Sequence, residues 1–77
     1  MSKLLQSDKR KQLANLVAEQ RKAKGMTQAE LARALGRHQP FIANIESGER
    51  RLDIVELIEI CDVLGADLNE IIAELRT

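Results

Sequence analysis

The chain has 77 residues, of which 44% are hydrophobic and 31% charged, with 12 basic and 12 acidic side chains. This length allows one domain at most, and a domain so small buries only about 60% of its surface, which favours association with a partner. One cysteine and one histidine exclude an internal disulfide and any Cys/His metal cluster. Because the chain contains no long apolar run, we expect it to have no membrane span and no signal peptide. We expect a cytoplasmic protein that needs no metal or cofactor.

The charges are unevenly distributed along the chain. Residues 1–51 contain eleven Lys or Arg and five Asp or Glu, whereas residues 52–77 contain seven acids and one base. This asymmetry indicates that the first part faces a polyanion and that the second part has another role. The alternative is that the charges only solvate helix surfaces.

Turn and capping residues divide the chain into five predicted helices, which gives an all-α fold. The first begins at Ser7 or Asp8 and ends before Gly25, a residue type that favours the position after a helix C-terminus. The second opens with a capping box of Thr27 and Glu30, in which each side chain bonds the other residue's backbone amide.

The third predicted helix begins between His38 and Pro40 and ends at Gly48. Proline suits a first turn, where its missing amide proton costs nothing. Because proline disfavours helical geometry in the residue before it, either His38 or Gln39 is the expected cap. The fourth and fifth helices repeat the capping pattern with aspartate, as Asp53 to Glu56 and Asp67 to Glu70.

The second and third helices, joined by a turn at Gly36, have the spacing of a helix-turn-helix unit. Many positions on either side of that turn match one family in register. They are Arg21, Gly25-Met26-Thr27-Gln28-Ala29-Glu30-Leu31-Ala32, Leu35-Gly36, Gln39, Ile42, Ile45-Glu46-Ser47-Gly48-Glu49-Arg50 and Leu64-Gly65. The sequence resembles the phage-repressor and Cro type of helix-turn-helix DNA-binding protein, also called the XRE family. The resemblance implies a compact five-helix, lambda-repressor-like domain that binds double-stranded DNA.

The third helix has an uncharged outer side. Projection at 100° per residue places Ile42, Ile45 and His38 on the inner side. The opposite side holds an amide and small residues, Pro40, Ala43, Asn44 and Ser47, with Gln39 at its edge. Short uncharged side chains let a helix enter the major groove, where Gln and Asn can bond adenine N6 and N7. The alternative is an ordinary polar surface.

The resemblance implies roles for individual residues. Gln39 matches the position that most often reads a base, and Asn44 matches a second reading position, with contact to phosphate or to water alone as its alternative. Pro40 and Ala43 at best touch a thymine methyl group. Gln28 matches a residue that bonds a phosphate and supports the first reader; its alternative is an ordinary residue of a helix start.

Phosphate contacts are expected from residues beside the third helix, because such contacts set the register of the protein on DNA. The residues in question are Arg37, His38, Ser47, Arg50 and Arg51. Gln39 and Arg50 are both expected to lie away from the core. Arg21 and Glu46 match a family pair that links the first helix to the third, so we expect a structural role for them. Cys61 is expected to be a buried, inert thiol.

The fourth and fifth helices have more apolar residues than one buried side requires. In the fourth helix, Glu56, Glu59 and Asp62 are interpreted as a single polar stripe, and Ile54 is expected on the inner apolar side with Cys61. The surplus predicts an interface. The expected dimer contacts are Val55, Ile58, Leu68, Ile71, Ile72 and Leu75.

These observations predict one DNA-binding domain over residues 1–77, in which residues 1–6 fray and residues 66–77 form the dimerisation helix. The predicted function is transcriptional regulation, most simply repression, by a homodimer on a palindromic operator. The alternative is an antitoxin or adaptor of the same fold whose main partner is another, toxin-like protein. No nucleophile–base pair or phosphate loop indicates an enzyme, and no membrane partner is expected.

Overall fold

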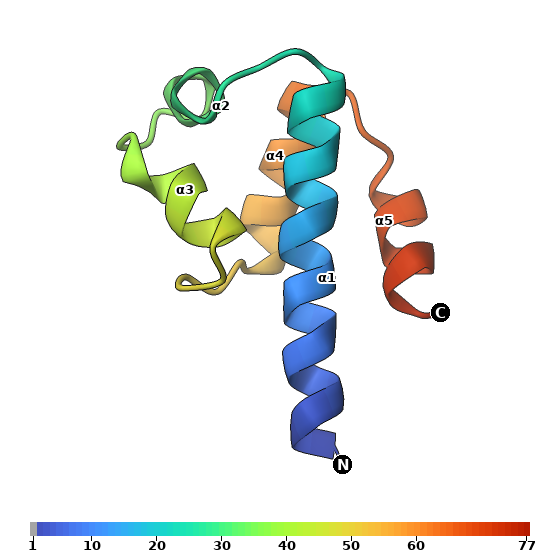
Figure 1. Ribbon diagram of the computed structural model, residues 1–77. Helices are drawn as coiled ribbons and strands as arrows, with labels where there is room; N and C mark the ends of the chain where they lie inside the picture. Colours follow the sequence, from blue (N-terminus) through green and yellow to red (C-terminus); the bar gives the residue numbers. More distant parts are fainter. Residues whose placement is uncertain (1) are drawn as a thin grey trace.

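A computed structural model describes the backbone of residues 2–77 and the side chains from Lys9 onward. The described residues form five helices: α1 (Ser2–Ala23), α2 (Gln28–Ala34), α3 (Pro40–Glu46), α4 (Ile54–Leu64) and α5 (Leu68–Leu75). Figure 1 shows α1 as the long helix in front, with α2 and α3 on one side, α5 on the other and α4 behind it. None of the described helices is long and apolar enough to cross a membrane.

The capping boxes predicted at the starts of α2 and α4 are confirmed. The Thr27 hydroxyl accepts from the Glu30 amide at 3.0 Å, and Glu30 Oε1 accepts from the Thr27 amide at 2.8 Å. Asp53 and Glu56 make the same two bonds at 2.8 and 3.1 Å. Each box satisfies two amides at the helix start. The backbone and hydroxyl bonds from Thr27 also lower the pKa of Glu30.

The first helix ends as predicted but begins earlier. Gly25 follows α1 with a φ of +77°, a left-handed conformation that costs glycine little. The helix begins at Ser2 instead of Ser7 or Asp8, because residues 3–6 are Lys, Leu, Leu and Gln, all good helix formers. The side chains that would tether residues 1–6 lie outside the described part, so their fraying stays a prediction.

Two further helix starts agree with expectation only in part. The N-cap of α3 is Gln39, one of the two residues predicted for that position. Gln39 has φ −53° and ψ −43°, which is helical geometry despite Pro40 after it, and its side chain makes no capping bond. At α5, the Asp67 carboxylate accepts from the Asn69 amide at 2.8 Å instead of the Glu70 amide. The Asp67 side chain thus caps α5, but neither bond of the predicted box between Asp67 and Glu70 forms.

All five helices contribute to one hydrophobic core. Its buried members are Val17, Leu31, Ala32, Phe41, Ile42, Ile45, Leu57, Ile60, Cys61, Leu64 and Ile71. Cys61 is only 3% exposed, as predicted. Burial raises the pKa of its thiol, and the nearby carboxylates of Asp62 and Asp67 add to the effect, which suits an unreactive side chain. Two charged residues, Arg21 and Glu56, are also buried.

The surface predicted for dimerisation is only partly exposed. Val55 is 61%, Ile58 41% and Ile72 37% exposed. In contrast, Ile71 is buried in the core, which corrects its assignment to the surface. Two more of the predicted residues are half-buried and pack against the core: Leu68 and Leu75. Ile54, predicted on the inner side of α4, is 57% exposed instead, because the core lies on the side of α4 that carries Leu57, Ile60 and Leu64.

Candidate nucleic-acid interface

The third helix presents the uncharged side that the sequence predicted. Phe41, Ile42 and Ile45 are buried against the rest of the domain, and the remaining positions stay at least partly accessible. Gln39, Pro40 and Ser47 are exposed, and Ala43 and Asn44 are half-exposed. His38 is exposed as well, which corrects its placement on the inner side: it precedes the first turn of α3, so a helical projection does not apply to it.

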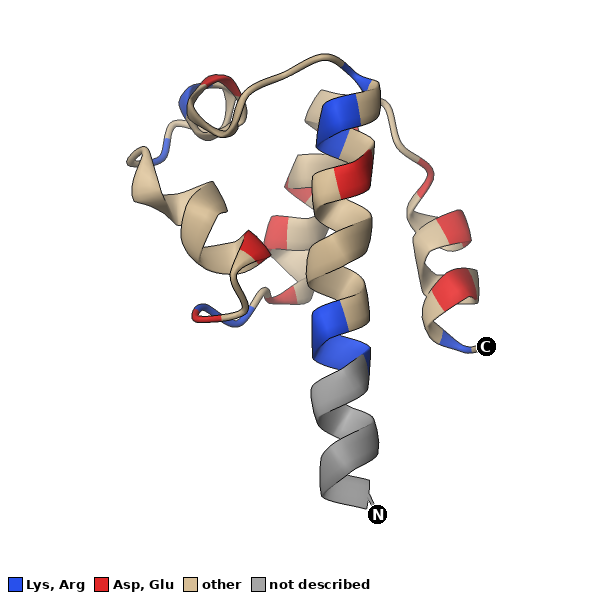
Figure 2. Cartoon of the chain, viewed as in Figure 1, with Lys and Arg blue, Asp and Glu red and all other residues tan. Residues whose placement is uncertain are grey.

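Basic residues lie before and after this uncharged side. Arg37 precedes α3, and Arg50 and Arg51 follow it, whereas α3 itself contains no Lys or Arg. Figure 2 shows the basic positions of the loops on either side of α3 and the acidic positions of α4 and α5. A helix whose exposed side is uncharged, with arginines in the loops before and after it, suits insertion between two phosphate chains.

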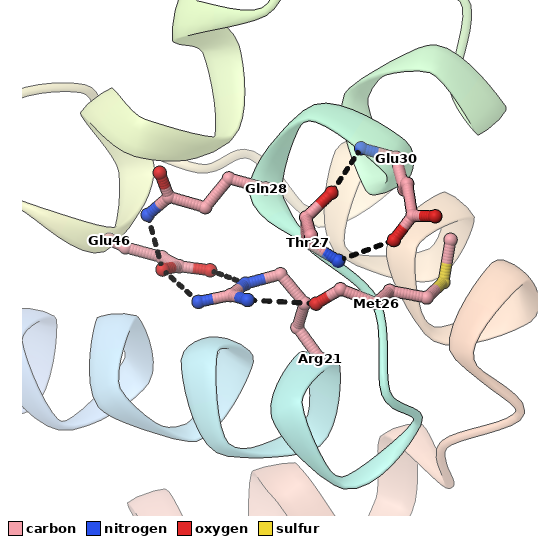
Figure 3. Close-up of polar contacts among 6 residues, drawn as sticks. All are labelled: Arg21, Met26, Thr27, Gln28, Glu30 and Glu46. Carbon is pink, nitrogen blue, oxygen red and sulfur yellow. Dashed lines mark hydrogen bonds and ion pairs between the residues drawn. The ribbon is translucent and has the colours of Figure 1, made fainter.

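A buried ion pair links α1 to α3. Arg21 Nε donates to Glu46 Oε2 at 2.7 Å, and Arg21 Nη2 donates to Oε1 at 3.0 Å. Arg21 also donates to the carbonyl of Met26 at 2.8 Å, so all three nitrogens of the guanidinium are bonded (Figure 3). Both side chains are about 10% exposed. This arrangement matches the structural role that the resemblance implied for the pair.

Gln28 joins this pair from α2. Its Nε2 donates to Glu46 Oε1 at 2.8 Å (Figure 3). Burial acts to raise the pKa of Glu46, but the bonds from Arg21 and Gln28 outweigh it, and the pKa is lowered overall. The Glu46 carboxylate in turn raises the pKa of Arg21. The family resemblance predicted that Gln28 bonds a phosphate and supports Gln39, the first base-reading residue. It did not predict the bond to Glu46.

A second cluster, absent from the sequence interpretation, surrounds Glu56 of α4. The carboxylate is 7% exposed, and its Oε2 accepts from Arg50 at 2.8 Å and from Arg37 at 3.4 Å. Both guanidiniums also lie over the ring of Phe41, at 4.9 and 4.6 Å from its centroid. Arg50 is therefore half-buried, which corrects the expectation that it lies away from the core. The burial of Glu56 also corrects its assignment to a solvent-exposed polar stripe with Glu59.

The comparisons with known proteins agree with this geometry. A family model described as helix-turn-helix matches residues 17–71. An uncharacterized HTH-type transcriptional regulator, y4dJ from Sinorhizobium fredii, is 31% identical over 65 residues, which cover 84% of each chain.

Two solved structures are also similar to the chain. An XRE-family like protein from Pseudomonas syringae pv. tomato has a TM-score of 0.91 and 37% identity, and the match covers 97% of this chain and 92% of that one. The clp gene regulator ClgR from C. glutamicum has a TM-score of 0.79 and 26% identity, with coverage of 88% and 87%. This chain thus belongs to the XRE family of helix-turn-helix DNA-binding transcriptional regulators.

Proposed function

We propose that the protein is a transcriptional repressor that binds a palindromic operator as a homodimer. The observation that carries the proposal is the uncharged, exposed side of α3 between Arg37 at one end and Arg50 and Arg51 at the other. The α3 helix would enter the major groove while the arginines contact the phosphates on either side of it. Occupation of an operator that overlaps a promoter is the simplest way for a domain with this surface to repress transcription.

Base reading is assigned to residues on the exposed side of α3. Gln39 lies at its start with an exposed amide that makes no capping bond, and we assign it to an adenine. Asn44 is the second reader, and Pro40 and Ala43 contact thymine methyl groups. Phosphate contacts are assigned to residues at the edges of this surface. They are Gln28, Arg37, His38, Ser47, Arg50 and Arg51.

Dimerisation is assigned to the exposed apolar residues of α4 and α5. Val55 and Ile58 of α4 and Ile72 of α5 are large side chains that remain open to solvent, as does Ile54, which we add to the surface. Burying them against a second copy removes apolar area from water. A two-fold dimer places its recognition helices about one turn of DNA apart, roughly 34–36 Å.

The test is selection of bound duplexes from random DNA, followed by footprinting. We expect an inverted repeat with half-site centres about 10 base pairs apart, or a multiple of one helical turn. A transcription assay with that repeat across a promoter should then show repression. Enrichment of a single half-site without an inverted partner would contradict the homodimer, and increased transcription would contradict repression.

The same apolar surface supports a second candidate. If Val55 and Ile58 contact a different protein, the domain acts as an antitoxin or adaptor, and DNA binding is then secondary. A gene for a toxin-like protein beside the coding sequence, together with co-purification of its product in a fixed ratio, would favour this candidate. A pure homodimer that binds the selected repeat with nanomolar affinity, as specific regulators do, would favour repression.

A further inference from the structure

Glu56 connects the two basic loops that border α3. Arg37 lies in the loop before the helix and Arg50 in the loop after it, yet both donate to the same oxygen, Oε2 of Glu56. Arg50 also donates to the carbonyl of Arg51 at 3.1 Å. The Phe41 ring beneath both guanidiniums limits their orientation further. One residue of α4 thereby bonds both arginine side chains.

The two oxygens of Glu56 have separate partners. Oε1 accepts from the backbone amide of Asp53 in the capping box, at 3.1 Å, and Oε2 accepts from the arginines. The carboxylate is buried, at 7% exposure, whereas the arginine side chains are 41% and 39% exposed. A guanidinium has five N–H donors, so each arginine can keep its bond to Glu56 and still donate to a phosphate.

We infer that Glu56 is a positioning residue for DNA binding, which holds Arg37 and Arg50 in place for phosphate contacts at both ends of α3. The inference rests on the proposed function, because it assigns both arginines to phosphates. Without the carboxylate, each long side chain must be ordered when DNA binds, and that ordering costs free energy. With the carboxylate present, the arginine side chains are already partly ordered in the free protein. Glu56 itself touches no DNA.

The test compares Glu56→Gln with Glu59→Gln. Glutamine retains an oxygen for the Asp53 amide, since Gln serves in capping boxes as Glu does, but it places an NH₂ group where Oε2 accepted from the arginines. Glu59 is an exposed acid on the same helix, so its variant changes the net charge equally. Affinity for operator and for scrambled duplex is measured over a range of salt concentrations, with helicity recorded in parallel.

We expect Glu56→Gln to weaken binding to both duplexes by about tenfold relative to Glu59→Gln, with base preference unchanged. The salt slope should become shallower by about one for each phosphate that an arginine no longer neutralises. Equal affinity and slope in the two variants would overturn the inference. A steeper slope in Glu56→Gln would also overturn it, because the carboxylate would then compete with phosphates for the arginines. Wild-type protein that binds neither duplex would overturn the proposed function as well.

A measurement on the wild-type protein covers the case in which Glu56→Gln does not fold. Order parameters of the arginine Nε–Hε groups report how firmly each side chain is held. We expect Arg37 and Arg50 to be more ordered than the exposed Arg51 before DNA is added. Mobility equal to that of Arg51 would overturn the inference, since no positioning would then exist in the free protein.

Discussion

Gln28 at the start of α2 donates to the Glu46 carboxylate at the end of α3 over 2.8 Å. Through this bond, the ion pair with Arg21 joins three helices instead of two, and it sets α2 against α3 within the helix-turn-helix unit. The residue that the resemblance assigned to a phosphate therefore has a partner inside the protein. Because the side-chain nitrogen of Gln28 already donates to Glu46, a phosphate contact from this side chain must share the nitrogen or displace the carboxylate.

Replacement of Glu46 by alanine should destabilise the fold. Arg21, at 8% exposure, would keep its charge and its bond to the Met26 carbonyl but lose its only carboxylate partner, and breaking a buried pair from one side costs about 3–5 kcal/mol. Urea unfolding followed by circular dichroism measures the decrease. Glu49→Ala, at an exposed acid just beyond α3, is the control and should change stability by less than about 0.5 kcal/mol. A decrease below about 1 kcal/mol for Glu46→Ala would show that Arg21 finds other partners.

The contribution of Glu46 should disappear in acid. The pKa of Glu46 in the folded protein lies below its ordinary value of 4.5, so the unfolded chain takes up the proton first as the pH falls. The stabilisation is therefore complete above about pH 5.5 and is lost as the pH drops through 4.5 and below. The difference in unfolding free energy between wild type and Glu46→Gln, measured from pH 7 to pH 3, should stay constant down to about pH 5.5 and shrink below it. Glu30 titrates alike in both proteins and cancels. A constant difference would contradict the assignment.

Gln39→Ala should remove discrimination at one base pair of each half-site without affecting the fold. The exposed amide makes no capping bond, and a bidentate contact with adenine is worth about 1–3 kcal/mol of discrimination. Affinity for the operator should fall and preference at one base pair of each half-site should flatten, while binding to scrambled DNA stays unchanged. Arg51→Ala is the comparison, because removal of a phosphate contact weakens binding to all sequences. Retained preference in folded Gln39→Ala would make Asn44 the leading reader.

Aspartate at exposed apolar positions should weaken the proposed dimer. Val55 is 61% exposed and should tolerate a charge in the monomer, whereas Ile71, at 4%, should not. Sedimentation at tens of micromolar, a range in which a functional dimer persists by mass action, should show a wild-type dimer that Val55→Asp and Ile72→Asp convert toward monomer. Ile71→Asp should instead lose helicity. A strictly monomeric wild type at that concentration would count against the dimer.

Local sequence signals predicted most of the helix boundaries. The capping boxes at Thr27 and Asp53 and the glycine that follows α1 act over a few residues, so their effect is visible in the sequence. The Arg21–Glu46 pair was predictable only through the family resemblance, since no local rule joins residues 25 positions apart. No local signal indicated that the Asp67 carboxylate would bond the Asn69 amide, so the absence of the predicted box with Glu70 was not foreseen.

A helical projection could not predict that the side chain of Glu56 is buried. A projection gives directions around the axis, and charged residues are assigned to the solvent side by default. Glu56 is nevertheless buried because Arg50 and Arg37, 6 and 19 residues away, pair with it. One signal was available: Glu56 lies one turn before Ile60, which belongs to the core. The wrong prediction for Ile54 has the same cause, because the inner side of α4 was assigned to the wrong residues.

The buried thiol of Cys61 gives a way to follow motions of the native protein. It is the only cysteine in the chain and is 3% exposed, so a thiol reagent can react only with molecules in which α4 has opened away from the core. The ratio of its labelling rate to that of an unfolded chain gives the equilibrium constant for that opening when reclosing is fast. The chain has no Trp or Tyr to serve as a fluorescent reporter. Cys61 therefore provides an intrinsic probe of whether α4 separates alone or only when the whole domain unfolds.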